Sequence, residues 1–231
     1  MHAIELEMQE RTQAEQRIGL STCGHVLTAE NFADFHRPEL SAVIMPRQLP
    51  HRIQEISAKL AQHNIEIHKP VTFPKRDVPA LLETALADIE PDMAAQKALL
   101  AQDMADVVQQ FKDTIRCRTV QLTLCTTYQD AFHQDSTQDF HLDESAYQLT
   151  CTYHGPGTEW LPKPNARMVL ELDDYQPIDP DGIEKTNAGD IVCFKTYALG
   201  SNQQHTNMLI HRAPPLEPGQ RRLVMVLWPV S

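Results

Sequence analysis

The chain has 231 residues, of which 42% are hydrophobic and 22% charged, and this composition is typical of one soluble globular domain with a sizeable core. Its formal net charge of -11 argues against nucleic acid as a main partner, because a phosphate backbone is bound by clustered Lys and Arg. No apolar run approaches the roughly 20 residues that span a bilayer, and the acidic start of the chain predicts neither a signal peptide nor a transit peptide.

The five cysteines form an odd set without a Cys-x-x-Cys motif. This pattern predicts reduced, mostly buried thiols in a cytoplasmic protein, and it argues against a structural zinc cluster. The cysteines are Cys23, Cys117, Cys125, Cys151 and Cys193.

Residues 1–116 are predicted to form a mainly helical N-terminal layer. The irregular pattern of residues 1–40 indicates a short helix followed by loops. Residues 41–45 are a short apolar run that predicts a strand, and residues 51–63 carry apolar side chains at helical spacing. Three prolines after this helix are expected to break the chain into extended connections: Pro70, Pro74 and Pro79.

The stretch from Pro79 to Arg116 consists mostly of helix-compatible residues. Pro91 is expected to start a second helix at its first turn, where a missing N–H costs little. Apolar side chains then follow the 3.6-residue period of a buried stripe, which predicts a helix packed on a sheet. The stripe is Leu99, Leu100, Met104, Val107, Val108 and Phe111.

The pattern changes at Cys117, after which apolar and polar residues alternate as in half-buried strands. Many short strands without helices between them predict an antiparallel sandwich or barrel of the jelly-roll type. The expected strands cover residues 119–124, 147–153, 168–172, 190–194, 208–210 and 223–230, with turn signals at 155–157, 179–182, 188–190 and 218–219. We therefore expect one α+β domain over residues 1–231, with the β core in residues 117–231.

A candidate metal site combines His141-Leu142-Asp143 with His211. Side chains two positions apart on an extended segment point to the same face, so His141 and Asp143 can bind one ion. His211 ends an apolar run and can supply a third ligand from a later strand. Two imidazoles and one carboxylate form the facial triad of non-haem Fe(II) sites, which leaves positions open for substrate, cosubstrate or oxygen. Zinc tolerates the same three ligands.

A second His-x-Asp match, His133-Gln134-Asp135, lies just upstream and is followed by a polar run that indicates a loop. His141-Leu142-Asp143 is instead followed almost at once by an alternating strand. A single histidine at a strand end is more often a hydrogen-bonded core or rim residue than a ligand. The combination of His141, Asp143, His211 and a nearby arginine pair is what favours a metal site.

The arginine pair, Arg221 and Arg222, opens the last predicted strand. A guanidinium can hold a carboxylate cosubstrate through two parallel charge-assisted hydrogen bonds. The alternative is a solvated strand edge or an ion pair with one of the many carboxylates. Tyr153 and Tyr128 lie on strands near the proposed ion and can hydrogen-bond the same cosubstrate, although such tyrosines more often pack amphipathically.

The segment from Gly155 to Trp160 predicts a tight turn whose tryptophan caps the core. It can also be read as a loop at the mouth of the barrel, with Glu159 and Trp160 facing the substrate. A zinc hydrolase with Glu159 as general base is a further, less supported hypothesis.

Residues 117–230 resemble the Fe(II)/2-oxoglutarate dioxygenases, whose double-stranded β-helix carries His-x-Asp, a distal His and a basic residue on the last core strand. The segment Ala-Gly-Asp-Ile-Val-Cys-Phe at residues 188–194 matches a pattern often found before the distal His in those enzymes. Counting back from Trp228 selects Arg222 as their basic residue, whereas counting from Gly219 selects Arg221. We prefer Arg222. The resemblance implies an oxygenase that uses Fe(II) with 2-oxoglutarate as a small-molecule cosubstrate.

Over most of its length the chain also resembles an uncharacterised bacterial family, domain of unknown function 1826. The resembling stretches are residues 140–143, 151–161 and 211–215. Members of that family are associated with zinc-responsive gene neighbourhoods. This resemblance leaves open a non-catalytic zinc-binding protein of metal homeostasis that uses the same His/Asp/His triad.

Overall fold

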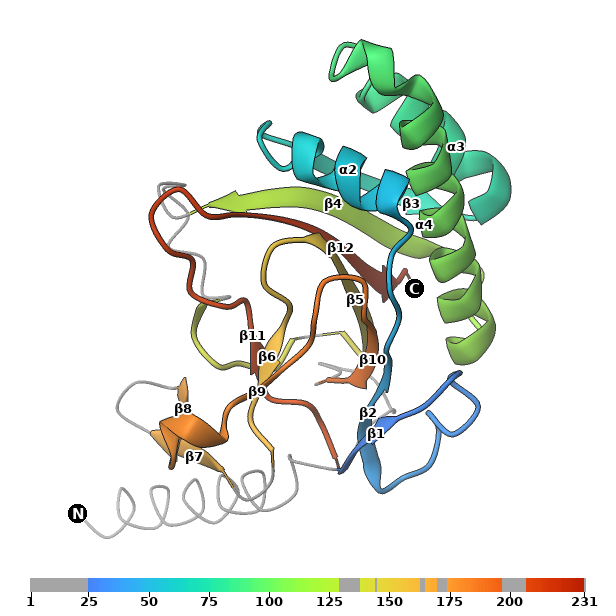
Figure 1. The fold of residues 1–231 in the computed structure, drawn as a ribbon. Coiled ribbons are helices and arrows are strands. Elements are labelled where there is room, and N and C mark those ends of the chain that lie inside the picture. The colour runs from blue at the N-terminus through green and yellow to red at the C-terminus, as the bar shows by residue number, and fades with distance from the viewer. Residues whose placement is uncertain are drawn as a thin grey trace, which may run out of the picture.

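The computed structural model describes residues 25–128, 138–143, 145–162, 165–169, 174–196 and 207–230. A curved seven-stranded sheet organises these residues, with helices on one face (Figure 1). All neighbouring strands are antiparallel except the first pair. In spatial order the strands are β1 (His25–Thr28), β2 (Leu40–Met45), β10 (Ile191–Lys195), β5 (Tyr147–His154), β12 (Arg221–Pro229), β4 (Val120–Tyr128) and β3 (Glu66–Val71).

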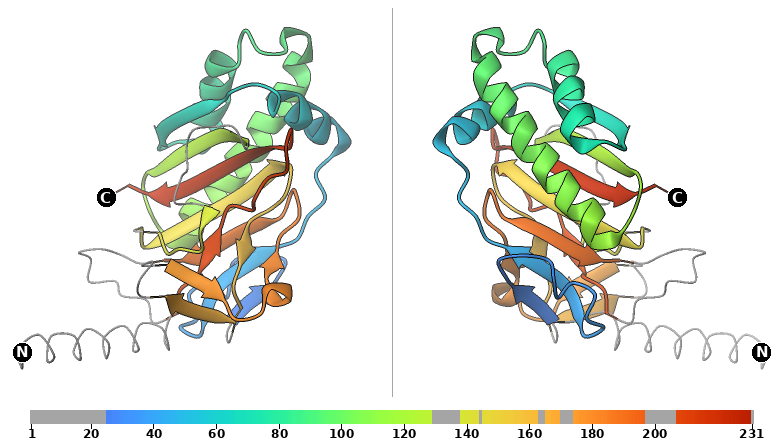
Figure 2. Two further views of the ribbon diagram at one scale, coloured as in Figure 1. Left: turned by 90° about the vertical axis from the view of Figure 1, so that its left-hand side faces the viewer. Right: turned by 90° about the vertical axis from the view of Figure 1, so that its right-hand side faces the viewer.

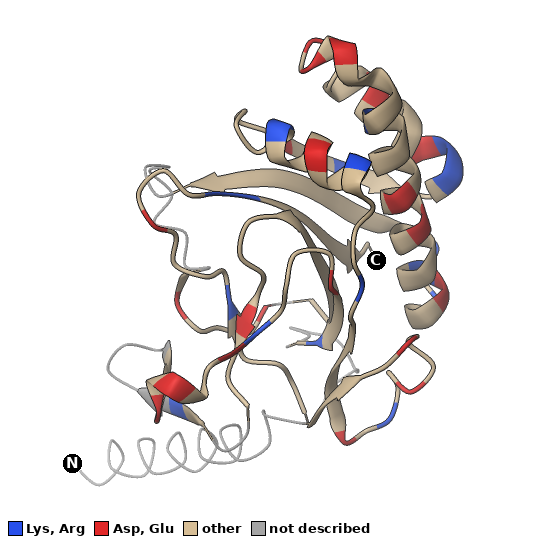
Figure 3. Cartoon of the chain, in the orientation of Figure 1, with Lys and Arg blue, Asp and Glu red and all other residues tan. Residues whose placement is uncertain are grey.

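Helices cover the outer face of this sheet, as the two side views show (Figure 2). They are α2 (His51–Leu60), α3 (Pro74–Ala85) and α4 (Ala94–Ile115), with a 3-10 turn η1 (Pro91–Met93) before the last. The predicted stripe of α4 is buried except for Leu99, which is 43% exposed. Asp and Glu residues are spread along α3 and α4 (Figure 3). Within the described residues, no helix is long and apolar enough to cross a bilayer.

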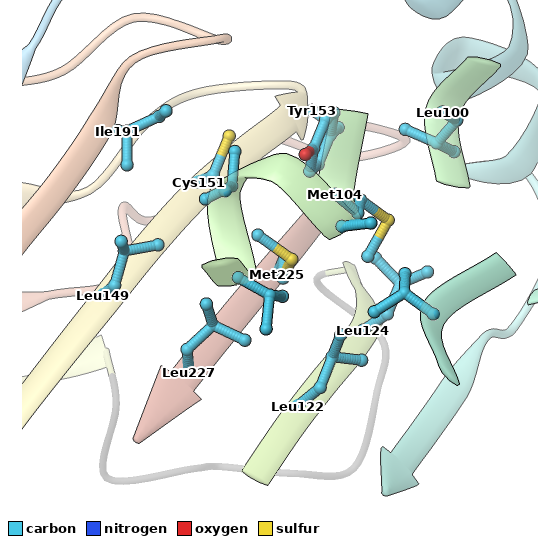
Figure 4. Packing of buried hydrophobic residues seen from close by; sticks show 14 of the residues in the cluster. Leu100, Met104, Leu122, Leu124, Leu149, Cys151, Tyr153, Ile191, Met225 and Leu227 are labelled. Atoms are coloured by element: carbon cyan, nitrogen blue, oxygen red, sulfur yellow. The ribbon is translucent and has the colours of Figure 1, made fainter. Parts of the chain in front are cut away.

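The main core lies between these helices and the outer face of the sheet. Alternate residues of the central strands point into it, because side chains two apart share a face of a strand. Figure 4 shows this packing, in which Met104 of α4 lies near Leu124 of β4 and Met225 of β12. The contributing strand residues include Leu122, Leu124, Leu149, Cys151, Tyr153, Leu223, Met225 and Leu227.

Two small sheets lie on the inner side of the large sheet, away from the helices (Figure 1). One has the order β11 (His211–Arg212), β6 (Glu159–Trp160) and β9 (Glu184–Lys185), and the other pairs β7 (Ala166–Val169) with β8 (Asp174–Pro177). A 3-10 turn, η3 (Pro180–Gly182), precedes β9. Trp160 packs with inward-facing residues of β2 and β10, so the three-stranded sheet faces the large one across a second, smaller core.

The described part of the N-terminal layer contains strands beside the expected helices. Within residues 25–116 it supplies β1, β2 and β3, and two of these form the edges of the large sheet. The predicted strand at 41–45 and helix at 51–63 are confirmed by β2 and α2. β3 was missed because an edge strand need not alternate regularly, and only Ile67 and Val71 of β3 are buried.

The three prolines also lie inside regular structure rather than in extended connections. Pro70 is in the edge strand β3, where a missing ladder donor is tolerated. Pro74 starts α3 at its first position, and Pro79 is inside the same helix at the cost of one backbone hydrogen bond. Pro91 starts η1, which leads directly into α4, as the sequence predicted for a helix start.

The β core follows the predicted alternation closely. The strands β4, β5, β10 and β12 confirm four of the expected strands. The expected strand at 208–210 is not a strand of its own, since only Met208 lies in a bridge there and β11 begins at His211. Of residues 168–172, only the start belongs to a described strand, β7. The helix expected near the N-terminus falls partly, and His133-Gln134-Asp135 wholly, outside the described residues.

Candidate metal centre

His141, Asp143 and His211 come together on the inner side of the fold. His141 faces His211 in an antiparallel bridge, in which each backbone N–H donates to the other residue's carbonyl at 3.0 and 3.2 Å. The two imidazole ring centroids are 4.7 Å apart. One ligand atom from each of the three residues lies within 4.8 Å of the others. The spacing is that of a three-ligand metal site.

Hydrogen bonds to the backbone orient both imidazoles. His141 Nδ1 is 2.7 Å from the carbonyl oxygen of Asp139, and His211 Nδ1 is 3.2 Å from that of Leu209. A carbonyl oxygen only accepts, so each Nδ1 is the donor. In the neutral rings each Nε2 therefore carries a lone pair, which is the arrangement found in histidines that bind a metal.

Asp143 lies where both lone pairs point. Its Oδ1 is 3.6 Å from His141 Nε2, and its Oδ2 is 3.0 Å from His211 Nε2. The Oδ2 atom is buried and makes no hydrogen bond. A nitrogen lone pair that faces a carboxylate oxygen is repelled by it unless a proton or a metal ion lies between the two atoms. The buried Asp143 oxygen thus fits a cation-binding role.

The pKa of Asp143 reflects the same need for positive charge. Burial raises this pKa, but positive charge on the neighbouring His211, and on His141, outweighs burial and holds the pKa well below its usual range. His211 is also well shielded, being only 4% exposed and packed on the Phe194 ring at a centroid distance of 4.5 Å. Two imidazole nitrogens and one carboxylate suit either Fe(II) or zinc.

Arg222 lies on the inner face of β12 and is only 5% exposed. Its Nη2 donates to Thr152 Oγ1 at 3.1 Å and to Thr158 Oγ1 at 3.2 Å, while its Nε makes no hydrogen bond. No described carboxylate forms a salt bridge with it. Burial lowers the pKa of Arg222 to about 10, with Cys125 and Cys151 opposing that shift. A buried guanidinium without an anion is unusual and suits an anionic ligand.

The inner face around Arg222 is polar although it is buried. Hydroxyl groups contribute to it, because several residues that alternate with the outer-face leucines of β4 and β5 are threonines. The buried polar residues there include Thr123, Gln148, Thr150, Thr152 and Thr158. Such a lining fits a polar ligand better than an apolar one.

Thr158 is held in place by a close backbone contact. Thr186 donates its N–H to the Thr158 carbonyl at 3.0 Å. A Cβ at Gly157 would lie 2.3 Å from the Thr186 carbonyl oxygen and 2.2 Å from its Oγ1, so only glycine fits there. This glycine therefore sets the position of one of the two hydroxyls that hold Arg222.

Arg221 and Tyr128 lie on the outer side instead. Arg221 Nη1 is 3.3 Å from both the Ala61 carbonyl and Asn64 Oδ1, just beyond α2. Its guanidinium carbon is 4.6 Å from the centre of the Tyr128 ring. Because neighbouring residues of a strand point to opposite faces, Arg221 and Tyr128 are directed away from the inner face that Arg222 occupies.

Tyr153 is also directed away from the candidate site. Its hydroxyl donates to Asp103 Oδ2 of α4 at 2.8 Å, and Asp103 in turn binds Arg47 through both carboxylate oxygens at 2.6 and 2.9 Å. Burial raises the pKa of Tyr153 well above its usual value. Tyr153 thus joins β5 to α4 and does not face Arg222.

Glu159 and Trp160 are adjacent on β6 but have different surroundings. Glu159 Oε2 forms an ion pair with Arg212 Nε at 2.8 Å. Trp160 is 6% exposed and packs against the large sheet, as expected of a tryptophan that caps the core. The alternative in which both side chains face substrate at the barrel mouth finds no support in these contacts.

Four residues around the site were not singled out from the sequence: Thr152, Thr158, Phe140 and Arg212. The threonines could have been found from the sequence, since apolar residues at positions 149, 151 and 153 of β5 alternate with polar ones. A strand that is buried on both faces with one polar face indicates an internal polar cavity. Phe140 and Arg212 had no such signal, because their contact depends on strand register.

A family model described as "Protein of unknown function (DUF1826)" matches residues 28–227. No curated protein matches the chain.

Among solved structures, the chain is similar to the dioxygenase for auxin oxidation 1 from Arabidopsis thaliana in its 2-oxoglutarate complex, at 10% identity and a TM-score of 0.43, covering 90% of this chain and 92% of that one. The rice dioxygenase for auxin oxidation has 12% identity and a TM-score of 0.42, with 83% and 74% covered. A prolyl-4-hydroxylase from Pseudomonas putida has 11% identity and a TM-score of 0.35, with 81% and 91% covered. These are distant likenesses.

Proposed function

We propose that this chain is a mononuclear non-haem iron oxygenase that consumes 2-oxoglutarate. The chain belongs to the DUF1826 family, because that family's model matches most of its length. Its core would be a double-stranded β-helix. The observation that carries the proposal is Arg222, a buried guanidinium without an anionic partner among the described residues, on the inner side where His141, Asp143 and His211 meet.

Each residue has a defined task in this proposal. His141, Asp143 and His211 hold Fe(II), which when bound supplies the oxidising chemistry. Arg222 binds the distal carboxylate of 2-oxoglutarate, and its free Nε offers a donor for that contact. Thr152 and Thr158 orient the guanidinium through their hydroxyls.

The inner face also excludes water from the site. His211 is covered by Phe194, and the threonines around Arg222 are almost completely buried. A dry environment strengthens the attraction between a guanidinium and a carboxylate. The likeness to dioxygenase structures, one of them a 2-oxoglutarate complex, agrees with this proposal but is too distant to carry it.

A non-catalytic zinc-binding protein is the second candidate. It is favoured by the donor set itself, since two imidazoles and a carboxylate suit zinc as well as iron. This candidate gives Arg222 no role, however. The zinc hydrolase is not proposed, because Glu159 is ion-paired with Arg212.

The test is succinate formation from 2-oxoglutarate by protein loaded with Fe(II), in the presence of oxygen and ascorbate, against protein loaded with zinc. We expect iron-dependent succinate in the wild-type protein and in Arg221→Met, and none in His141→Ala or Arg222→Met. If iron-loaded wild-type protein forms no succinate and consumes no oxygen, while zinc binds tightly, the zinc-binding candidate replaces this proposal.

A further inference from the structure

We infer that Phe140, Arg212 and Glu159 are positioning residues that fix the strand register of the metal ligands from the reverse side of the ladder. The inference rests on the proposed metal site. None of the three side chains is a ligand, and none is assigned to cosubstrate binding.

The strand register places these residues in one row. β11 pairs with β6 so that His211 is opposite Trp160 and Arg212 is opposite Glu159. On the other side of β11, His141 is opposite His211 in an antiparallel bridge. Since the partner of the next residue lies one step back in an antiparallel pair, Phe140 comes opposite Arg212.

Two rows of side chains therefore cross the ladder on opposite faces. Adjacent residues of an extended segment point to opposite sides, so the first row holds Trp160, His211 and His141. The second row holds Glu159, Arg212 and Phe140. The first row faces the candidate metal ion, and the second lies behind it.

Direct contacts hold the second row together. Arg212 Nε donates to Glu159 Oε2 at 2.8 Å, and the Arg212 guanidinium carbon is 4.3 Å from the centre of the Phe140 ring. Phe140 is 2% exposed and belongs to a small apolar cluster with Leu161, Tyr175 and Ile210. The side chains of Arg212 and Glu159 are 23% and 17% exposed, so solvent screens their ion pair only in part.

The row is needed because the ladder itself is very short. β11 has only two residues, and His141 joins it through an isolated bridge. So few backbone hydrogen bonds specify register weakly. A slip of one residue turns every side chain to the other face, and here it would move one imidazole away from the ion.

The chemistry of Arg212 suits this task. A planar guanidinium can stack on an aromatic ring and donate to a carboxylate at the same time, which a lysine ammonium does less well. Glu159 also neutralises a cation located one residue from a metal ligand. The second row thus supports the metal ligands without placing an unneutralised positive charge near the ion.

The test measures metal affinity and ligand geometry in apo-protein titrated with Co(II) and with Zn(II). The variants are Arg212→Gln, Glu159→Gln and Phe140→Leu, and the control is Arg76→Gln. Arg76 has the same kind of contacts, being stacked on Phe73 at 4.5 Å and paired with Asp77 at 2.8 Å, but it lies on α3. We expect each ladder variant to weaken metal affinity by about 10-fold or more and to change the Co(II) visible spectrum, because loss of partners behind metal ligands commonly costs about 10- to 100-fold. Arg76→Gln should change neither quantity.

Wild-type affinity and an unchanged Co(II) spectrum in a folded Arg212→Gln protein would overturn the inference while leaving the metal site intact. If Arg212→Gln does not fold, Arg212→Lys and Phe140→Leu carry the test, and wild-type binding in both overturns it equally. A wild-type protein that binds neither ion would overturn the proposed function, and the inference with it.

Discussion

His141 and His211 face each other across an antiparallel bridge with their rings 4.7 Å apart, although they lie in distant parts of the sequence. Their Nδ1 atoms are both used in hydrogen bonds to the backbone, so both Nε2 atoms are turned toward Asp143. His141, Asp143 and His211 are therefore arranged as the ligands of one divalent ion would be.

Replacing His141 by alanine should abolish stoichiometric metal binding. Two protein ligands remain in that variant, and they hold a divalent ion far less tightly than three. Elemental analysis after anaerobic loading and desalting measures the metal content. His63→Ala is a suitable control, since His63 pairs with Glu90 beyond α2. Equal metal content in His141→Ala and wild-type protein would refute the ligand assignment.

Replacing Arg222 by methionine should raise the stability of the metal-free protein. The drop of its pKa from 12.5 to about 10 corresponds to roughly 3 kcal/mol spent on burying its charge. The two lost hydrogen bonds to threonines offset part of this, at about 1 kcal/mol each. We therefore expect a melting temperature higher by about 3 °C, measured by calorimetry at pH 7.

Arg222→Met should also lose 2-oxoglutarate binding. A gain in stability together with a loss of ligand binding is typical of a residue retained for function at the expense of stability. Arg221→Met is the matched comparison, because Arg221 is partly exposed and already bonded to residues beyond α2. A clearly destabilised Arg222→Met protein would show that the hydrogen bonds and packing of Arg222 outweigh the cost of burying its charge.

Gly157→Ala should disturb the Arg222 site from behind. A new Cβ would overlap the Thr186 backbone, and Thr158 is hydrogen-bonded to that backbone. The expected cost is about 2–4 kcal/mol in the free energy of unfolding, together with weaker 2-oxoglutarate binding and little change in metal affinity. Urea unfolding and ligand titration test the two effects separately, and unchanged values in both would exclude the overlap.

Cys151 should make the wild-type protein sensitive to alkaline pH. Burial raises the pKa of its thiol from 9.0 to about 11, although Arg47 opposes that shift. The unfolded chain loses this proton above pH 9 while the folded protein retains it, so stability falls between pH 9 and pH 11 by up to about 3 kcal/mol. Cys151→Ala should show a shallower decline in urea unfolding over that range. Parallel declines would contradict this origin.

The sequence predicted much of the β core and the three clustered residues of the candidate metal centre. β4, β5, β10 and β12 are long and alternate regularly, so their pattern could be read directly. β3 and β11 could not be read this way. One is an edge strand with few buried residues, and the other has only two residues, whose pairing depends on a distant segment.

The side of each strand was harder to predict than its presence. Tyr153 and Arg221 were candidates for cosubstrate binding, but both lie on strand faces directed away from Arg222. Alternation groups residues into two faces, yet it does not tell which face is inside when both are buried. For Arg222, the neighbouring threonines carried that information.

An anaerobic titration of Fe(II)-loaded protein with 2-oxoglutarate, followed by visible absorbance in the wild-type and Arg222→Met proteins, tests the proposed iron and cosubstrate sites together. We expect a charge-transfer absorbance to appear in the wild-type protein loaded with about one equivalent of iron. The absorbance should be absent in Arg222→Met at the same concentrations of iron and 2-oxoglutarate. No absorbance change in iron-loaded wild-type protein would rule out the proposed 2-oxoglutarate site, and an equal change in both proteins would rule out Arg222 as its carboxylate-binding residue.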